Sequence, residues 1–155
     1  MTPLPIVLDI PNHFAAIPGS GNVPVAFTHT FDVAKYVVAL QSLSTWEKES
    51  FIIGDKLTWN EFLGIAEQVT GSEFTVVHDS LDTLATGHIT ELPAHRQVYP
   101  FFPKEVLQSL FAAIGRMFEQ GAFNLEVKGS LRERFPEITP RSVRELVKEA
   151  YGGHE

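Results

Sequence analysis

Residues 87–102 combine side chains that could carry out acid–base chemistry on a small molecule. The segment holds two imidazoles, a carboxylate, a guanidinium, a phenol and two phenylalanine rings. A small-molecule site requires an apolar pocket with a few convergent polar groups, and this composition meets that requirement. We predict that Arg96 holds an enolate, phenolate or carboxylate while His95 or Tyr99 transfers a proton. Contacts with the substrate are predicted for His88, Thr90, Glu91, Phe101 and Phe102.

A second candidate group is His13 with Phe14, which follows the short apolar segment 5–10. That segment is predicted to be a buried strand. Ligands of doubly wound folds bind beyond the carboxyl ends of strands. His13 is therefore a candidate general acid or base, and Phe14 a candidate substrate contact. The alternative for His13 is a solvated loop histidine. The alternative for residues 87–102 is a proline-rich connection whose aromatic rings pack on the core.

Two other groups have simpler explanations. Thr30 is predicted to cap a helix whose first turn contains Asp32, and His29 is then a packed or surface residue. His78 and Asp79 resemble part of a metal site, but a metal needs three or four converging ligands and the ligand spacings are absent. We therefore expect no metal, and Asp79 is a candidate for acid–base or supporting work.

Composition limits the class of protein. With 155 residues, 44% of them hydrophobic, the chain is expected to form one domain, residues 1–155, with a real core. The net charge of −7 disfavours nucleic acid as a partner. The absence of cysteine excludes disulfides and thiol chemistry, and it fits a cytoplasmic protein. No apolar run is long enough to span a membrane, so we expect no membrane insertion.

Alternating strand and helix patterns come first, and helices follow. Strands are predicted at residues 5–10, 50–54 and 73–78, with a structured loop at 11–24. A helix of about 13 residues begins near Phe31, and others are predicted at residues 59–70, 81–86 and 103–120 and from Thr139 onward. The fold class is therefore α/β with α+β-like character, a small sheet of about three to four strands with about five helices.

Two further patterns concern the helical end of the chain. The helix at 103–120 carries an apolar stripe that is expected to face the core. Its members are Val106, Leu107, Leu110, Phe111, Ile114, Met117 and Phe118. Basic residues between 128 and 148 are predicted to form a solvated helix face.

Four spaced segments carry a family resemblance. Residues 23–37 (VPVAFTHTFDVAKYV), 50–58 (SFIIGDKLT), 87–95 (GHITELPAH) and 135–140 (FPEITP) resemble the NmrA-like and isoflavone-reductase-like branch of atypical short-chain dehydrogenases. The resemblance covers roughly residues 5–150. It implies the fold of the C-terminal, substrate-side half of that family.

The family's glycine-rich nucleotide turn has no counterpart. Gly19-Ser-Gly21 follows a predicted loop and lacks the third glycine and the helix that would hold a pyrophosphate. The family's catalytic pair would also lie in the N-terminal half. The resemblance therefore implies a substrate pocket but no cofactor and no hydride transfer.

The resulting hypothesis is a cofactor-independent, redox-neutral cyclase or isomerase. It would act by general acid–base catalysis on a hydrophobic aromatic or polyketide-like molecule of secondary metabolism. The alternatives are a non-catalytic NmrA-like ligand-binding or regulatory module and a fragment of an NAD(P)-dependent reductase. Strands that have lost their neighbours would leave edges and an apolar face uncovered, so we expect a homodimer.

Overall fold

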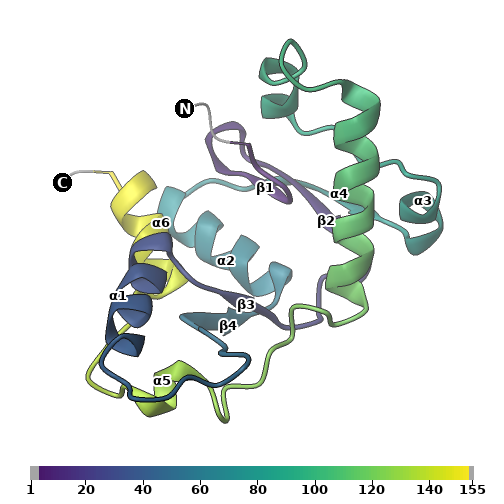
Figure 1. The fold of residues 1–155 in the computed structure, drawn as a ribbon. Helices are drawn as coiled ribbons and strands as arrows, with labels where there is room; N and C mark the ends of the chain where they lie inside the picture. Colours follow the sequence, from purple (N-terminus) through teal and green to yellow (C-terminus); the bar gives the residue numbers. More distant parts are fainter. Residues whose placement is uncertain (1–3, 154–155) are drawn as a thin grey trace.

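The computed structural model describes residues 4–153, and the ends of the predicted domain, residues 1–3 and 154–155, lie outside the described part. Within it, two small sheets and six α-helices surround an apolar core (Figure 1). The predicted fold class is confirmed. In chain order the elements are β1 (Leu8–Asp9), η1 (Ile10–Asn12), β2 (Phe14–Pro18), β3 (Val25–Phe27), α1 (Thr30–Leu40), β4 (Asp55–Leu57), α2 (Trp59–Thr70), β5 (Thr75–Asp79), α3 (Leu81–Ala85), η2 (Pro93–Gln97), α4 (Lys104–Glu119), α5 (Leu131–Arg134) and α6 (Val143–Tyr151).

β2 is the central strand of the three-stranded sheet. It pairs antiparallel with β1 and parallel with β5, in the order β1-β2-β5. The prediction of a loop over residues 11–24 is therefore wrong for residues 14–18. Ala15 and Ile17 are completely buried, and neighbours on both sides satisfy the backbone of this strand. The apolar run is short and lies between prolines, so its pattern alone did not indicate a strand.

The second sheet pairs β3 with β4 antiparallel, and Phe27 lies opposite Asp55. The predicted strand at residues 50–54 is wrong, because the ladder begins only at Asp55. Ile53 is nevertheless completely buried. The apolar run therefore reflects burial of a connection rather than a strand.

α2 begins and ends where the sequence predicts. The Thr58 hydroxyl accepts from the Glu61 amide at 3.1 Å, and the Glu61 carboxylate accepts from the Thr58 amide at 2.7 Å. Gly71 ends the helix with a φ of 65°, a left-handed conformation that glycine adopts without steric cost. α3 likewise begins after Ser80, whose hydroxyl accepts from the Thr83 amide.

Two other helix starts differ from prediction. His29, not Thr30, caps α1, and its Nδ1 accepts from the Phe31 amide at 3.2 Å. The last helix begins at Val143 rather than near Thr139, because Ser142 and Glu145 form a capping box there. No helix among residues 4–153 combines the length and apolar character needed to span a bilayer.

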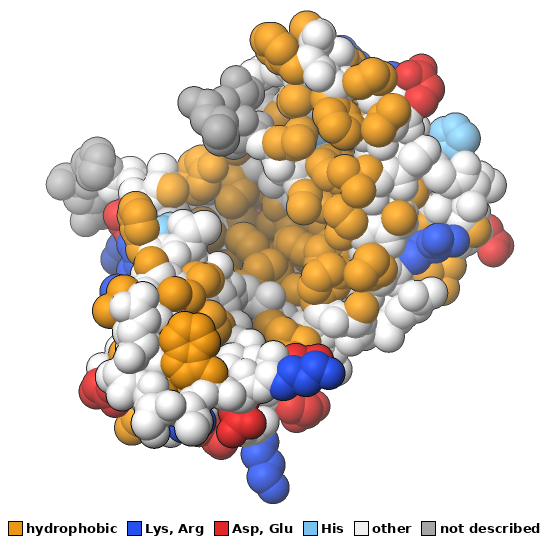
Figure 2. Space-filling model, in the orientation of Figure 1, with side chains coloured by type: hydrophobic (Ala, Val, Ile, Leu, Met, Phe, Trp, Pro, Cys, Tyr) orange, Lys and Arg blue, Asp and Glu red, His pale blue; other side chains and the backbone are white. Residues whose placement is uncertain are grey.

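α4 buries only part of its apolar stripe. Leu107, Phe111 and Phe118 are buried, whereas the stripe members Val106, Leu110 and Met117 are between 42% and 52% exposed. Figure 2 shows hydrophobic side chains over α4 and in a hollow between α4 and the side of the molecule that carries α1 and α6. This face is more apolar than an ordinary solvated surface requires.

Candidate functional site

His95 lies in the core rather than at a cavity. Its side chain is completely buried, Nε2 is 2.9 Å from the Pro5 carbonyl oxygen, and Nδ1 accepts from the Leu92 amide at 3.3 Å. The ring also packs against Phe111. Burial lowers the pKa of His95, which favours a neutral ring. In this arrangement His95 holds η2 against the N-terminal segment, and a proton-transfer role remains a prediction that the placement does not favour.

Arg96, Tyr99 and Glu91 lie together at the surface. The Arg96 Nε donates to Glu91 at 2.9 Å, and Lys104 forms a second ion pair with the same carboxylate. These two cations, Lys104 first, lower the pKa of Glu91 to about 2. Glu91 is therefore anionic at neutral pH. It pairs with the guanidinium of Arg96, which we expected to hold the substrate.

The Tyr99 hydroxyl is buried and has no hydrogen-bond partner among the described residues. Burial, and then the adjacent Glu91 carboxylate, raise its pKa to about 12. The Lys104 ammonium lies 5.6 Å from the ring centre. Tyr99 therefore keeps its proton at neutral pH, and a pKa this far above neutral makes the phenol a weaker acid than an unshifted tyrosine.

The predicted substrate contacts are divided between structural and exposed positions. Thr90 donates from its amide and hydroxyl to the Asp79 carboxylate, at 2.9 and 2.7 Å. His88 lines an open groove of about 570 Å³ with Lys104. Phe101 is 86% exposed, whereas Phe102 is half-buried. These side chains do not converge on one enclosed pocket.

His13 lies in a left-handed turn, with a φ of 48°, directly before β2. Its ring meets the edge of Phe74 at a centroid distance of 5.4 Å. Phe14 is half-buried on β2. His13 is exposed, and it lines neither of the two apolar cavities described below.

Asp9 is the buried polar group of an apolar cavity of about 290 Å³. Its carboxylate accepts from the Ala94 amide at 2.8 Å and from Asn12 at 2.9 and 3.0 Å, so it joins the end of β1 to η2. Sequence reasoning treated Asp9 only as an interruption of an apolar run. A carboxylate within an otherwise apolar predicted strand was the signal available. The lining residues also include Leu4, Pro5, Leu8, Ile10, Gln97 and Tyr151.

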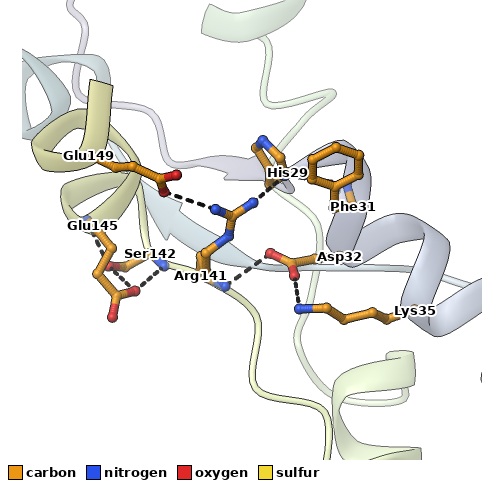
Figure 3. A network of polar contacts seen from close by, with 8 residues as sticks. All are labelled: His29, Phe31, Asp32, Lys35, Arg141, Ser142, Glu145 and Glu149. Atoms are coloured by element: carbon orange, nitrogen blue, oxygen red, sulfur yellow. Dashed lines mark hydrogen bonds and ion pairs between the residues drawn. The ribbon is translucent and has the colours of Figure 1, made fainter. Parts of the chain in front are cut away.

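A second apolar cavity, of about 220 Å³, lies between β3, α2 and α6. His29 and Arg141 are at this cavity, and Figure 3 shows the guanidinium between His29 and Glu149. Arg141 was overlooked because it belongs to a segment interpreted as a solvated helix face. Only the tertiary arrangement brings it to His29, which is 112 positions away in the chain.

The glycine turn does not fit a dinucleotide. A Cβ atom at Gly19 would lie 2.6 Å from the Glu119 carboxylate, and Ser20 donates to that carboxylate from both its amide and its hydroxyl. The turn is thus occupied by an anion, and it leads to β3 rather than to a helix. A pyrophosphate needs free amides at a helix N-terminus. Within residues 4–153, no group of three or more His, Cys, Asp or Glu side chains could hold a metal ion.

The fold is that of the C-terminal part of Rossmann-like reductases. The binary complex of leucoanthocyanidin reductase with NADPH from Vitis vinifera superposes with a TM-score of 0.66 and 23% identity, over 90% of this chain and 45% of that one. AtPrR2 in its apo form gives a TM-score of 0.64 and 19% identity, over 88% of this chain and 44% of that one. The resemblance to the C-terminal half of the NmrA-like and isoflavone-reductase-like family is confirmed.

Sequence relatives are named oxidoreductases. Oxidoreductase BOA1 of Botryotinia fuckeliana is 37% identical over 135 residues, which cover 85% of this chain and 41% of that protein. Oxidoreductase swnN of Metarhizium robertsii is 28% identical over 97% of this chain and 45% of that protein. The chain therefore spans less than half the length of these relatives. No family model matches it.

Proposed function

We propose that this chain is the substrate-side part of an NAD(P)-dependent reductase that acts on a hydrophobic small molecule. The observation that carries the proposal is the extent of the alignment: 86% to 91% of the chain superposes on 41% to 46% of solved reductases. Three of these structures are described as NADPH complexes. The dinucleotide would be held by a separate nucleotide-binding part, since the glycine turn of this chain does not fit it.

The chain itself would supply an apolar surface and a few polar groups. The cavity beside Asp9 and the hollow beside α4 offer apolar walls. Tyr99 retains a proton at neutral pH, and the Arg96 side chain is 79% exposed. In this proposal Arg96 exchanges Glu91 for a phenolic or carbonyl oxygen of the substrate, and a shift of the Tyr99 side chain exposes its buried hydroxyl. One solved relative was determined with (+)pinoresinol, a molecule of this hydrophobic kind.

The proposal is tested by complementation. The part of oxidoreductase BOA1 outside the aligned region is mixed with the full chain, and NADPH oxidation is measured with phenolic and carbonyl substrates. We expect NADPH binding by the mixture and not by the chain alone, with turnover only in the mixture. Turnover that is unchanged by adding the chain, or NADPH binding by the chain alone, would contradict the proposal.

The same assay distinguishes the reductase proposal from the redox-neutral hypothesis. Conversion of an aromatic substrate by the chain alone, without any nucleotide, would favour the cofactor-independent cyclase or isomerase. In whichever assay shows turnover, Tyr99→Phe and Arg96→Ala should lower kcat by about tenfold or more if these groups act on the substrate. Arg116→Ala, an exposed arginine on α4, is the matched control. Unchanged kcat in both site variants would remove Arg96 and Tyr99 from the site.

A further inference from the structure

The cavity between β3, α2 and α6 has apolar walls and a polar rim. Phe27, Phe62 and Leu146 are among the apolar lining residues, and the volume is about 220 Å³. His29 and Arg141 supply the ring and guanidinium at the same cavity. This volume is below the roughly 300–1,000 Å³ of drug-sized ligand sites, so the cavity suits a ligand with a body about as small as one aromatic ring.

Arg141 is held by its backbone and leaves its guanidinium at the rim. Its amide donates to the buried Asp32 carboxylate at 3.0 Å. The guanidinium donates from Nη1 to Glu149 at 3.0 Å and from Nη2 to His29 Nδ1 at 2.8 Å (Figure 3). The Arg141 side chain is 32% exposed and that of Glu149 is 69% exposed. An ion pair with so exposed a carboxylate contributes little stability, so another anion can replace Glu149 at low cost.

The protonation of His29 follows from its contacts. Nδ1 accepts from both the Phe31 amide and the Arg141 guanidinium, so it carries no proton. The proton of the neutral ring is therefore on Nε2. In Figure 3 this second nitrogen points away from Arg141, and no residue among 4–153 bonds to it. His29 thus positions the guanidinium through Nδ1, while its Nε2–H faces away from Arg141.

We propose that this cavity binds a small monocarboxylate with an aromatic or similarly apolar body. The carboxylate replaces Glu149 on the Arg141 guanidinium, and the apolar body lies among Phe27, Phe62 and Leu146. Arginine pairs with carboxylates through parallel charged hydrogen bonds, which gives such a site selectivity over neutral analogues. The proposal goes beyond the proposed reductase function and does not depend on it, because all the residues belong to this chain and lie apart from the Glu91 cluster.

Calorimetric titration of the full chain tests the site. Benzoate and 3-phenylpropanoate are the probes, and benzamide is the neutral analogue. Arg141→Gln should weaken carboxylate binding at least about tenfold. Glu149→Gln, which removes the competing carboxylate, should strengthen binding several-fold. The matched controls are Arg116→Gln on α4 and Glu49→Gln in the segment between α1 and β4, both exposed, and they should bind as the unmodified chain does.

The opposite changes in the Arg141 and Glu149 variants distinguish a specific site from a loss of folding. Glu149→Gln is expected to gain affinity, which a misfolded variant would not do. The proposal is overturned if neither carboxylate binds the unmodified chain or Glu149→Gln at millimolar concentration. It is also overturned if benzamide binds as tightly as benzoate, or if Arg141→Gln binds benzoate unchanged.

Discussion

At the residue scale, the environment of a side chain decides its chemistry more than its type does. Asp32 is completely buried in the first turn of α1, yet it carries two charge-assisted contacts: the Lys35 ammonium at 2.7 Å and the Arg141 amide at 3.0 Å. Burial alone would raise the pKa of Asp32, but these contacts outweigh it and the net shift is downward. The carboxylate is therefore a structural anion that joins α1 to the segment before α6.

Replacing Asp32 should reveal this role through pH. Because the folded pKa lies below the unfolded value of about 3.9, the charge stabilises the fold above that pH and its contribution is lost as pH falls through the folded pKa. Asp32→Asn should lower the free energy of unfolding by about 1–3 kcal/mol at pH 7, and the deficit should shrink below about pH 4. Urea unfolding at pH 7 and at pH 3 measures this loss in the free energy of unfolding.

Asp82→Asn is the control for this experiment, since Asp82 is an exposed acid in the first turn of α3. It should change the free energy of unfolding by less than about 0.5 kcal/mol. A deficit for Asp32→Asn that is constant between pH 7 and pH 3 would contradict the assigned charge.

At the scale of the elements, the approach of α4 to β2 depends on one small residue. A Cβ atom at Gly115 would lie 3.1 Å from the Pro18 side chain and 3.3 Å from that of Leu84. Glycine at this point lets the helix backbone come close to the strand and to α3. The polar segment that follows α3 is positioned by the same contact, because α3 and α4 flank it.

Gly115→Val should therefore overpack this junction and lower the free energy of unfolding by about 1–3 kcal/mol. Gly64→Val in α2 is the matched control, because nothing lies within 4 Å of a Cβ atom there. Because valine has a higher helix propensity than glycine, Gly64→Val should leave the free energy of unfolding unchanged or raise it by roughly a few tenths of a kcal/mol. Thermal unfolding followed by circular dichroism compares the two. Equal effects at both positions would show that α4 does not need the close approach.

At the scale of the whole molecule, part of the apolar surface stays uncovered. Val106, Leu110 and Met117 are exposed along one side of α4. A second copy of the chain could cover this surface through a two-fold contact. A nucleotide-binding part, as proposed for the reductase, could cover it instead.

We predict a homodimer for the chain alone at micromolar concentration. Substitution of Val106, Leu110 and Met117 together by Gln should convert it to a monomer, whereas Val38→Gln, on the exposed face of α1, should not. Sedimentation velocity measures the mass. A monomeric unmodified chain would exclude the dimer and leave a different partner to cover α4.

Local sequence patterns predicted the elements whose ends are determined within a few residues. The capping box at Thr58 and the glycine at Gly71 bound α2 without help from the rest of the chain. The spaced motifs also indicated the correct part of the reductase fold. Adjacent hydrogen bonds and helix periodicity are local properties, which the sequence displays directly.

Only the tertiary structure decided which strands pair and which polar groups meet. β2 is a strand because β1 and β5 flank it, and the run at residues 50–54 buries Ile53 without joining a sheet. His95 was expected at a pocket but is buried, and Arg141 was expected in solvent but lies at a cavity with His29. These outcomes depend on contacts between segments up to 112 positions apart. Local propensity carries no information about such contacts, because burial and pairing arise from the packing of the whole chain.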